Sequence, residues 1–183
     1  IVAVSLNLVG GDSSNWKIQH NILHHTYTNI HGHDEDISNK LGARLSPHGK
    51  HKAFQRFQVI YIFILYSLMT AYWVLVKDFI GFFTYAKRGI DGETKGSRIK
   101  KFLTILSWKI FYITYMMVLP VVVLHIPVWQ MFVGFFTLHF VGGLVLSIVF
   151  QLAHVVEGTT FPKPNDENNI ENEWAIHQLN TTA

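Results

Sequence analysis

The amino-acid sequence predicts an all-α integral membrane protein, with a two-span helical hairpin, interfacial helices and a cytoplasmic cap rich in histidine. The first observation is composition, since 49% of the 183 residues are hydrophobic and 14% are aromatic, which is apolar for a soluble domain. The second is a set of three apolar stretches, each long enough to cross a bilayer as a helix. The third is a group of three histidines within six residues, which precedes all three stretches.

The first apolar stretch, residues 57–76, runs for 20 residues and has basic residues on both sides. Those before it include Arg44, Lys50, Lys52 and Arg56, and those after it include Lys77, Lys87 and Arg88. Because lysine and arginine mark the cytoplasmic ends of membrane helices, a single crossing should not carry them at both ends. We therefore expect residues 57–76 to lie on or partly within the membrane, and residues 77–101 to form a polar connector.

The other two apolar stretches, residues 105–124 and 128–150, are separated only by His125-Ile126-Pro127. That link has no lysine or arginine, whereas lysines gather at the start of the pair, the last of them Lys109. These charges predict a transmembrane hairpin that enters from the cytoplasm and returns to it, with Lys109 extending its ammonium group to the interface. The alternative is three crossings, which would place His154 on the opposite side from the first histidines.

Composition and sequence also exclude several classes of function. No cysteine is present, which excludes disulfides, thiolate catalysis and cysteine-ligated metal sites. The net charge is only +3 and no nucleic-acid-binding motif accompanies it, so we expect no nucleic-acid partner. Residues 1–9 lack the basic start and the cleavage site of a signal peptide. Because the chain begins at Ile1 and ends in a polar tail, we expect it to be an internal piece of a longer protein.

The group of histidines has the pattern His-x-x-x-His-His at His20, His24 and His25. Imidazole is the commonest neutral metal ligand in proteins. On an α-helix, His20 and His24 would share one face and His25 would point about 100° away from His24. One metal ion could then take the first two side chains, and a neighbouring ion the third. His31 and His33, beside an acidic stretch, could form a separate metal site, but a solvated loop is the simpler interpretation.

His154 follows the last apolar stretch, where it can meet the first histidines on the same side of the membrane. We therefore predict a shared metal site that includes His154. Side chains that could orient its ligands from outside are Gln19, Asn29, Asp34, Asp36, Gln151 and Glu157. His139, in the middle of the last span, is a candidate for lining a substrate tunnel. The alternative for His139 is a hydrogen bond to a neighbouring helix.

The stretch from Trp16 to Asn29, followed by Asp34-Glu35-Asp36-Ile37, resembles the second histidine box of membrane fatty acid desaturases. The likeness is closest to the acyl-CoA and front-end branch found in bacteria. The resemblance implies that the three clustered histidines are iron ligands. It also implies that His154 is the further ligand that the family carries at the end of its fourth transmembrane helix. Residues 174–178 and 181–182 resemble the stretch that leads to the family's third box.

The resemblance covers the chain in order, so residues 1–183 are interpreted as one fragment of a desaturase domain. Its expected parts are a cytoplasmic histidine-box segment (1–52), a membrane-embedded or interfacial helix (57–76), two transmembrane helices (105–124 and 128–150) and a cytoplasmic segment (151–183). The family's first box, His-Asp-x-x-His, would precede Ile1, and its third box would follow Ala183. This chain alone is therefore expected to be inactive.

For the intact protein, the resemblance implies two iron ions, O₂ as co-substrate and a cis double bond formed in an acyl chain. It implies no catalytic residue beyond the metal ligands. The implied substrate is a fatty acyl-CoA or an acyl-lipid of the membrane, and the electron donor is a cytochrome-b-type haem domain or a ferredoxin. The implied location is the bacterial inner membrane, with the metal site on the cytoplasmic side.

Three alternatives to a desaturase remain open from the sequence. The nearest is a fatty acyl hydroxylase or other oxygenase of the same superfamily. Another is a non-catalytic membrane protein that binds or transports metal, and the last is a membrane scaffold whose histidines are incidental. A metal transporter would distribute its ligands across the spans, whereas the clustered histidines precede the spans here and His154 follows them.

Overall fold

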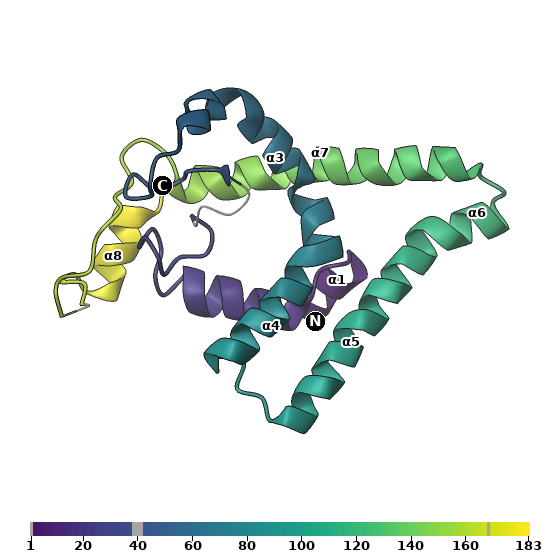
Figure 1. Ribbon diagram of the computed structural model, residues 1–183, viewed down its shortest axis with the longest axis horizontal. Helices are drawn as coiled ribbons and strands as arrows, with labels where there is room; N and C mark the ends of the chain where they lie inside the picture. Colours follow the sequence, from purple (N-terminus) through teal and green to yellow (C-terminus); the bar gives the residue numbers. More distant parts are fainter. Residues whose placement is uncertain (1, 38–41, 168) are drawn as a thin grey trace. The chain divides into compact units, whose positions relative to one another are not determined.

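Helices form the regular structure of the residues that the computed structural model describes, which are 2–37, 42–167 and 169–183 (Figure 1). The first elements are α1 (Val2–Leu8), α2 (Ser13–Trp16) and the π-helix η1 (Lys17–His24). The next are the 3₁₀ helix η3 (Ala53–Phe57), α3 (Gln58–Tyr72), the π-helix η4 (Trp73–Lys77) and α4 (Asp78–Arg88). The last are α5 (Lys95–Ile113), the π-helix η5 (Thr114–Val118), α6 (Leu119–Val123), α7 (Val128–His154) and α8 (Trp174–Thr181). The described residues contain no strand, so the all-α prediction is confirmed.

Three continuous helices are long and apolar enough to cross a membrane, namely Ala53–Arg88, Lys95–Val123 and Val128–His154. The link predicted at residues 125–127 is confirmed, because one of these helices ends at Val123 and the next begins at Val128. Both ends of the polar connector, residues 77–101, are helical, because polar side chains do not by themselves interrupt a helix. The interruption comes at Gly89, whose φ of 67° is a left-handed conformation that ends α4. The fold thus adds a third candidate span to the two that the charges predicted.

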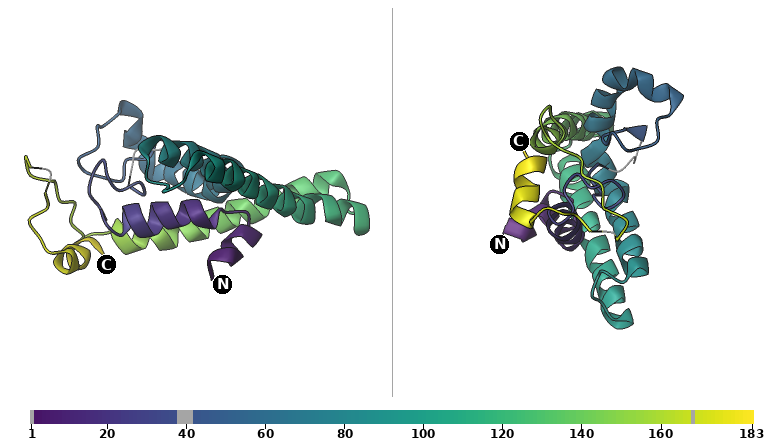
Figure 2. Two further views of the ribbon diagram at one scale, coloured as in Figure 1. Left: turned by 90° about the horizontal axis from the view of Figure 1, so that it is seen from below. Right: turned by 90° about the vertical axis from the view of Figure 1, so that its left-hand side faces the viewer.

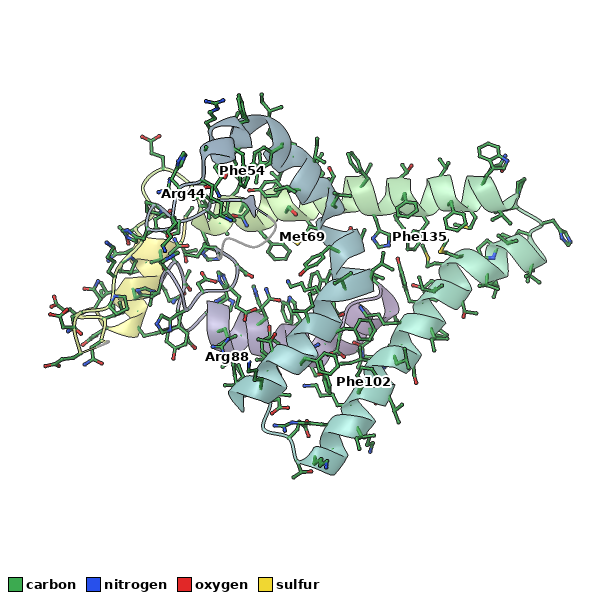
Figure 3. All side chains as sticks on the ribbon, in the orientation of Figure 1. Arg44, Phe54, Met69, Arg88, Phe102 and Phe135 are labelled. Carbon is green, nitrogen blue, oxygen red and sulfur yellow. The ribbon has the colours of Figure 1, made fainter. Side chains whose placement is uncertain are left out.

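The chain folds into two compact units. The first unit consists of residues 1–18 and 68–143, and the second consists of residues 19–67 and 144–183. In the first unit, α5, η5 and α6 run on as a single rod (Figures 1 and 2). The side chain of Phe102 on α5 points toward α4, where its ring centroid lies 5.5 Å from that of Phe82 (Figure 3). A buried core of Val74, Tyr112 and Phe135 forms further along the rod.

A buried ion pair joins α4 to α5 in the first unit. The ammonium nitrogen of Lys109 lies 2.5 Å from Oδ2 of Asp78, and the two residues are only 8% and 2% exposed. Lys109 also donates to the backbone carbonyls of Gly10 and Trp73. Asp78 accepts the N–H of Asp12 at 2.8 Å and the indole N–H of Trp73 at 3.0 Å. The prediction that Lys109 reaches the membrane interface is therefore wrong, because a carboxylate on another helix holds it inside the unit.

Candidate metal centre

Residues 17–24 form a π-helix, and this geometry gathers the three clustered histidines. The N–H of His25 donates to the carbonyl of His20 at 3.0 Å, an i→i+5 bond that fits one more residue into the turn than an α-helix does. The ring centroids of His20 and His25 are therefore 4.6 Å apart, and each lies 5.3 Å from that of His24. The prediction that His25 turns away on a regular α-helix is wrong, since all three imidazoles lie together.

The end of α7 brings a fourth imidazole to the same place. The ring centroid of His154 lies 4.5 Å from that of His24. Nδ1 of His154 lies 3.2 Å from the carbonyl oxygen of Thr181, and because that oxygen can only accept, Nδ1 carries the proton. Nε2 then keeps its lone pair, which is the form in which imidazole binds a metal. We call His20, His24, His25 and His154 the histidine cluster, and all four belong to the second unit.

The carboxylate of Asp34 accepts a hydrogen bond from Nδ1 of His24, as the carbonyl of Thr181 does from Nδ1 of His154. The two carboxylate oxygens of Asp34 lie 3.0 and 3.1 Å from Nδ1 of His24, and the two residues are only 1% and 2% exposed. The same carboxylate accepts the backbone N–H groups of Asn29, at 2.9 Å, and Asp36, at 2.8 Å. Because a carboxylate accepts, Nδ1–H of His24 donates and Nε2 is available to a metal. A carboxylate that orients a histidine in this manner is a common feature of metal sites.

The local charges affect His20 and His24 differently. Burial is the main reason that the pKa of His20 is lowered to about 4. The negative charge of Asp36 acts to raise this pKa, whereas the neighbouring histidines lower it further. Burial also acts to lower the pKa of His24, but the hydrogen bond with Asp34 and the charges of Asp36 and Asp34 outweigh it and raise the pKa. His20 is therefore neutral at pH 7, whereas the two carboxylates favour the protonated form of His24 more than water does.

Asp36 brings an oxygen donor to the edge of the histidine cluster. Its Oδ1 accepts the side-chain N–H of Gln19 at 2.5 Å, and its Oδ2 lies 3.5 Å from Nδ1 of His24. His20, His24 and Asp36 each offer a ligand atom within 4.8 Å of the other two, a spacing that one metal ion can bridge. Gln19 and Asp36, predicted to orient the ligands from outside, thus lie against the cluster, and Asp36 lies close enough to bind a metal directly.

Asn29 connects the histidine-box segment to two other parts of the second unit. The residue is fully buried and has a φ of 59°, a left-handed conformation that is uncommon outside glycine. Its side-chain NH₂ group lies 2.9 Å from the carbonyl oxygen of His154 and 3.2 Å from those of Thr160 and Thr181. The sequence predicts an orienting role for Asn29, but it gives no sign of carbonyl partners that lie 125 to 152 residues away in the chain.

The two remaining orienting candidates, Gln151 and Glu157, differ in their surroundings. Gln151 lies on α7, one turn before His154, and its Oε1 atom is buried without a hydrogen-bond partner among the described residues. Such an orphaned acceptor is costly unless a further group reaches it. Glu157 lies beyond the end of α7 and is exposed. Gln151 is therefore the better placed of the two to contact something bound at the cluster.

His139 lies in the first unit, where it joins three helices. Its Nδ1 lies 3.2 Å from the hydroxyl of Thr70 on α3, and its Nε2 lies 3.0 Å from the hydroxyl of Tyr112 on α5. Thr70 gives its proton to the backbone carbonyl of His139 at 2.7 Å, so Nδ1–H must donate to Thr70 and Tyr112 must donate to Nε2. The hydrogen-bonding interpretation of His139 is confirmed, and its role beside a substrate tunnel stays a prediction.

Known proteins resemble this chain over its whole length. The fatty acid desaturase family model matches residues 1–183. The chain is 33% identical to the sn-1 linoleoyl-lipid 6-desaturase of Arthrospira platensis over 96% of its own length and 46% of that protein. It is also 33% identical to the sn-1 linoleoyl-lipid 6-desaturase of Synechocystis, over 100% of this chain and 50% of that protein. It is 30% identical to the acyl-lipid (8-3)-desaturase of Physcomitrium patens, over 100% of this chain and 38% of that protein.

No solved structure matches the chain. The chain spans about half the length of the first two of these relatives. Since the family model matches every residue and the helices are long and apolar enough to cross a membrane, the chain belongs to the fatty acid desaturase family of integral membrane proteins.

Proposed function

We propose that the histidine cluster is part of a di-iron centre, and that the intact protein inserts a cis double bond into an acyl chain with O₂ as co-substrate. The observation that carries this proposal is the convergence of four imidazoles, two from η1, one from the residue after it and one from the end of α7, with neighbouring ring centroids 4.5–5.3 Å apart. Four imidazoles at these distances bring enough nitrogen donors together to bind metal.

The residues present fit a bound metal. Nδ1 of His24 and of His154 each donate to a fixed oxygen acceptor, which leaves both Nε2 atoms as ligands. Imidazole-rich ligation suits iron, among other metals. The buried, unpartnered Oε1 of Gln151 marks a further polar position beside His154. When bound, the irons would supply the strong oxidant, made from O₂ and two delivered electrons, that an unactivated methylene requires. The residues of this chain hold and orient those ions, and further ligands come from the rest of the intact protein.

The relatives favour a substrate that is already part of a membrane lipid. Their names describe a linoleoyl-lipid and acyl-lipids, whereas the sequence left acyl-CoA and acyl-lipid open. One candidate span leads directly into the cluster, because α7 ends at His154. We propose that the acyl chain of a lipid is drawn from the bilayer to a cytoplasmic metal site in a bacterial inner membrane. The electrons then come from a cytochrome-b-type haem domain or a ferredoxin.

The first test is to express the intact protein in a host whose lipids lack its product. Iron content and fatty-acid profile are measured for the wild type, for His24→Ala, and for His51→Ala as a control. His51 is also a histidine of the second unit, but it is exposed. We expect bound iron and a new double bond in the wild type and in His51→Ala, and loss of both in His24→Ala. A hydroxylated acyl chain in place of a new double bond would show that the protein is a hydroxylase. Bound iron without any change in the lipids would favour a metal-binding role.

The lipid substrate is tested separately by an isotope chase. Cells are fed a labelled saturated or less unsaturated acyl chain until it is incorporated into glycerolipid, and synthesis of the protein is then induced. New double bonds in the preformed labelled lipid, without exchange of its head group, are expected for an acyl-lipid substrate. New double bonds confined to freshly made lipid would instead indicate acyl-CoA.

A further inference from the structure

Helix α8 makes two hydrogen bonds to a single backbone atom of the histidine-box segment. The indole N–H of Trp174 donates to the carbonyl oxygen of His25 at 3.2 Å, and the side-chain N–H of Gln178 donates to the same oxygen at 3.1 Å. The two donors are four residues apart, so they lie on one face of α8. Carbonyl groups at the end of a helix have no hydrogen-bond partner within that helix. His25 lies just beyond η1, and its carbonyl oxygen accepts both of these hydrogen bonds from α8.

The same face of α8 makes further contacts around the cluster. Nε2 of His177, a residue that is 4% exposed, donates to the carbonyl of Thr28 at 2.9 Å. The carbonyl of Thr181 accepts from Nδ1 of His154 and from the side chain of Asn29, both at 3.2 Å. In Figure 1, α8 lies beside the end of α7 and the loop that follows η1. One short helix therefore touches the backbone of the histidine box and the ring of the fourth histidine.

His25 needs such an anchor more than its neighbours do. The rings of His24 and His154 are each fixed by a bond from Nδ1. Among the described residues, the hydrogen bonds of His25 are made by its backbone, its ring lies against those of His20 and His24, and its side chain is exposed. The backbone of His25 sets the direction of its Cα–Cβ bond and thereby the region that its ring can reach, and Trp174 and Gln178 hold that backbone.

We infer that Trp174 and Gln178 are positioning residues for the metal centre, which act by fixing the peptide of His25 so that its imidazole stays in the cluster. This inference rests on the proposed function, because it assumes that His25 binds a metal. Neither residue touches the metal in this arrangement. The other explanation is that the two bonds only stabilise the end of the helix, and that explanation predicts no effect on the metal in the folded protein.

The test uses the intact protein, stripped of metal and loaded with Co²⁺ as a spectroscopic probe. Trp174→Phe keeps an aromatic ring but removes the N–H, and Gln178→Met keeps the length of the side chain but removes its donors. The control is Leu179→Ala, because Leu179 lies on the same helix and is 76% exposed. Three quantities are measured for each variant: Co²⁺ affinity by competition with a chelator, the visible ligand-field spectrum at equal metal content, and the melting temperature of the metal-free protein.

We expect the double variant to lose about 10–100-fold in Co²⁺ affinity, the range typical for residues that orient metal ligands. Its ligand-field spectrum should change, each single variant should show a smaller loss, and Leu179→Ala should match the wild type. A double variant with wild-type affinity and spectrum would overturn the inference. So would one that melts at a lower temperature but binds Co²⁺ normally when folded. A wild-type protein that binds no Co²⁺ would instead contradict the proposed function.

Discussion

Breaking the ion pair between Lys109 and Asp78 should destabilise the protein more than removing the pair altogether. In Lys109→Met, the carboxylate of Asp78 keeps the N–H groups of Asp12 and Trp73 but loses the ammonium group of Lys109, in a site where Asp78 is 2% exposed. Leaving one partner of a buried pair uncompensated costs about 3–5 kcal/mol. In the double variant with Asp78→Asn, no charge is left behind, and the main loss is the donor to the carbonyl of Gly10, about 1 kcal/mol.

The assay is thermal unfolding of the intact protein in detergent, followed by the fraction that stays monodisperse on size exclusion. For a cooperative unit of about 150–250 residues, a loss of 3–5 kcal/mol corresponds to a decrease in melting temperature of roughly 6–20 °C. The double variant should recover most of that decrease. The reasoning is refuted if Lys109→Met melts within about 2 °C of the wild type, or if the double variant is no more stable than Lys109→Met. Lys163→Met, at an exposed position outside the spans, is the control.

Three further predictions concern other contacts. Gly10→Ala should lower the free energy of unfolding by about 1–3 kcal/mol, because φ is +85° there and a Cβ would come within 3.0 Å of the Tyr112 ring; an unchanged melting temperature would contradict the packing described. Tyr112→Phe should cost about 0.6–1.7 kcal/mol, as expected for one interhelical hydrogen bond in a membrane protein, and the loss should vanish in a His139→Phe background. Asp34→Asn should weaken metal binding about 10–100-fold in a chelator competition, because His24 loses the carboxylate that orients it; equal affinity would show that Asp34 has no such role.

The sequence predicted the helical membrane architecture because apolar length and basic flanks report directly on the bilayer. It predicted the proximity of His20 and His24 because α and π turns both bring residues four apart together. It failed at His25, since nothing in the residues of η1 distinguishes an i→i+5 turn from an i→i+4 turn. It failed at Lys109 because the partner carboxylate is 31 residues away in the chain.

The contribution of α8 was equally hidden in the sequence. Trp174 and Gln178 bind a backbone carbonyl 149 and 153 residues away. Thr181 binds the ring of His154 through its own carbonyl oxygen. A backbone acceptor is present at every residue whatever its side chain, so no pattern of residue types can mark these positions. Such partners are found only when the chain's distant segments are placed beside one another.

The π-turn of η1 sets a limit on how this motif can be transplanted. A designer who copies His-x-x-x-His-His onto a regular α-helix would reproduce the residue spacing but not the metal-binding geometry, since the third imidazole would rotate out of the group. Conversely, deleting Ile18, which leaves the spacing of the three histidines unchanged, would remove the extra residue of the π-turn and let the segment relax to an α-helix, in which His25 turns away from His20. The length of this segment is therefore as much a part of the site as the identity of its residues.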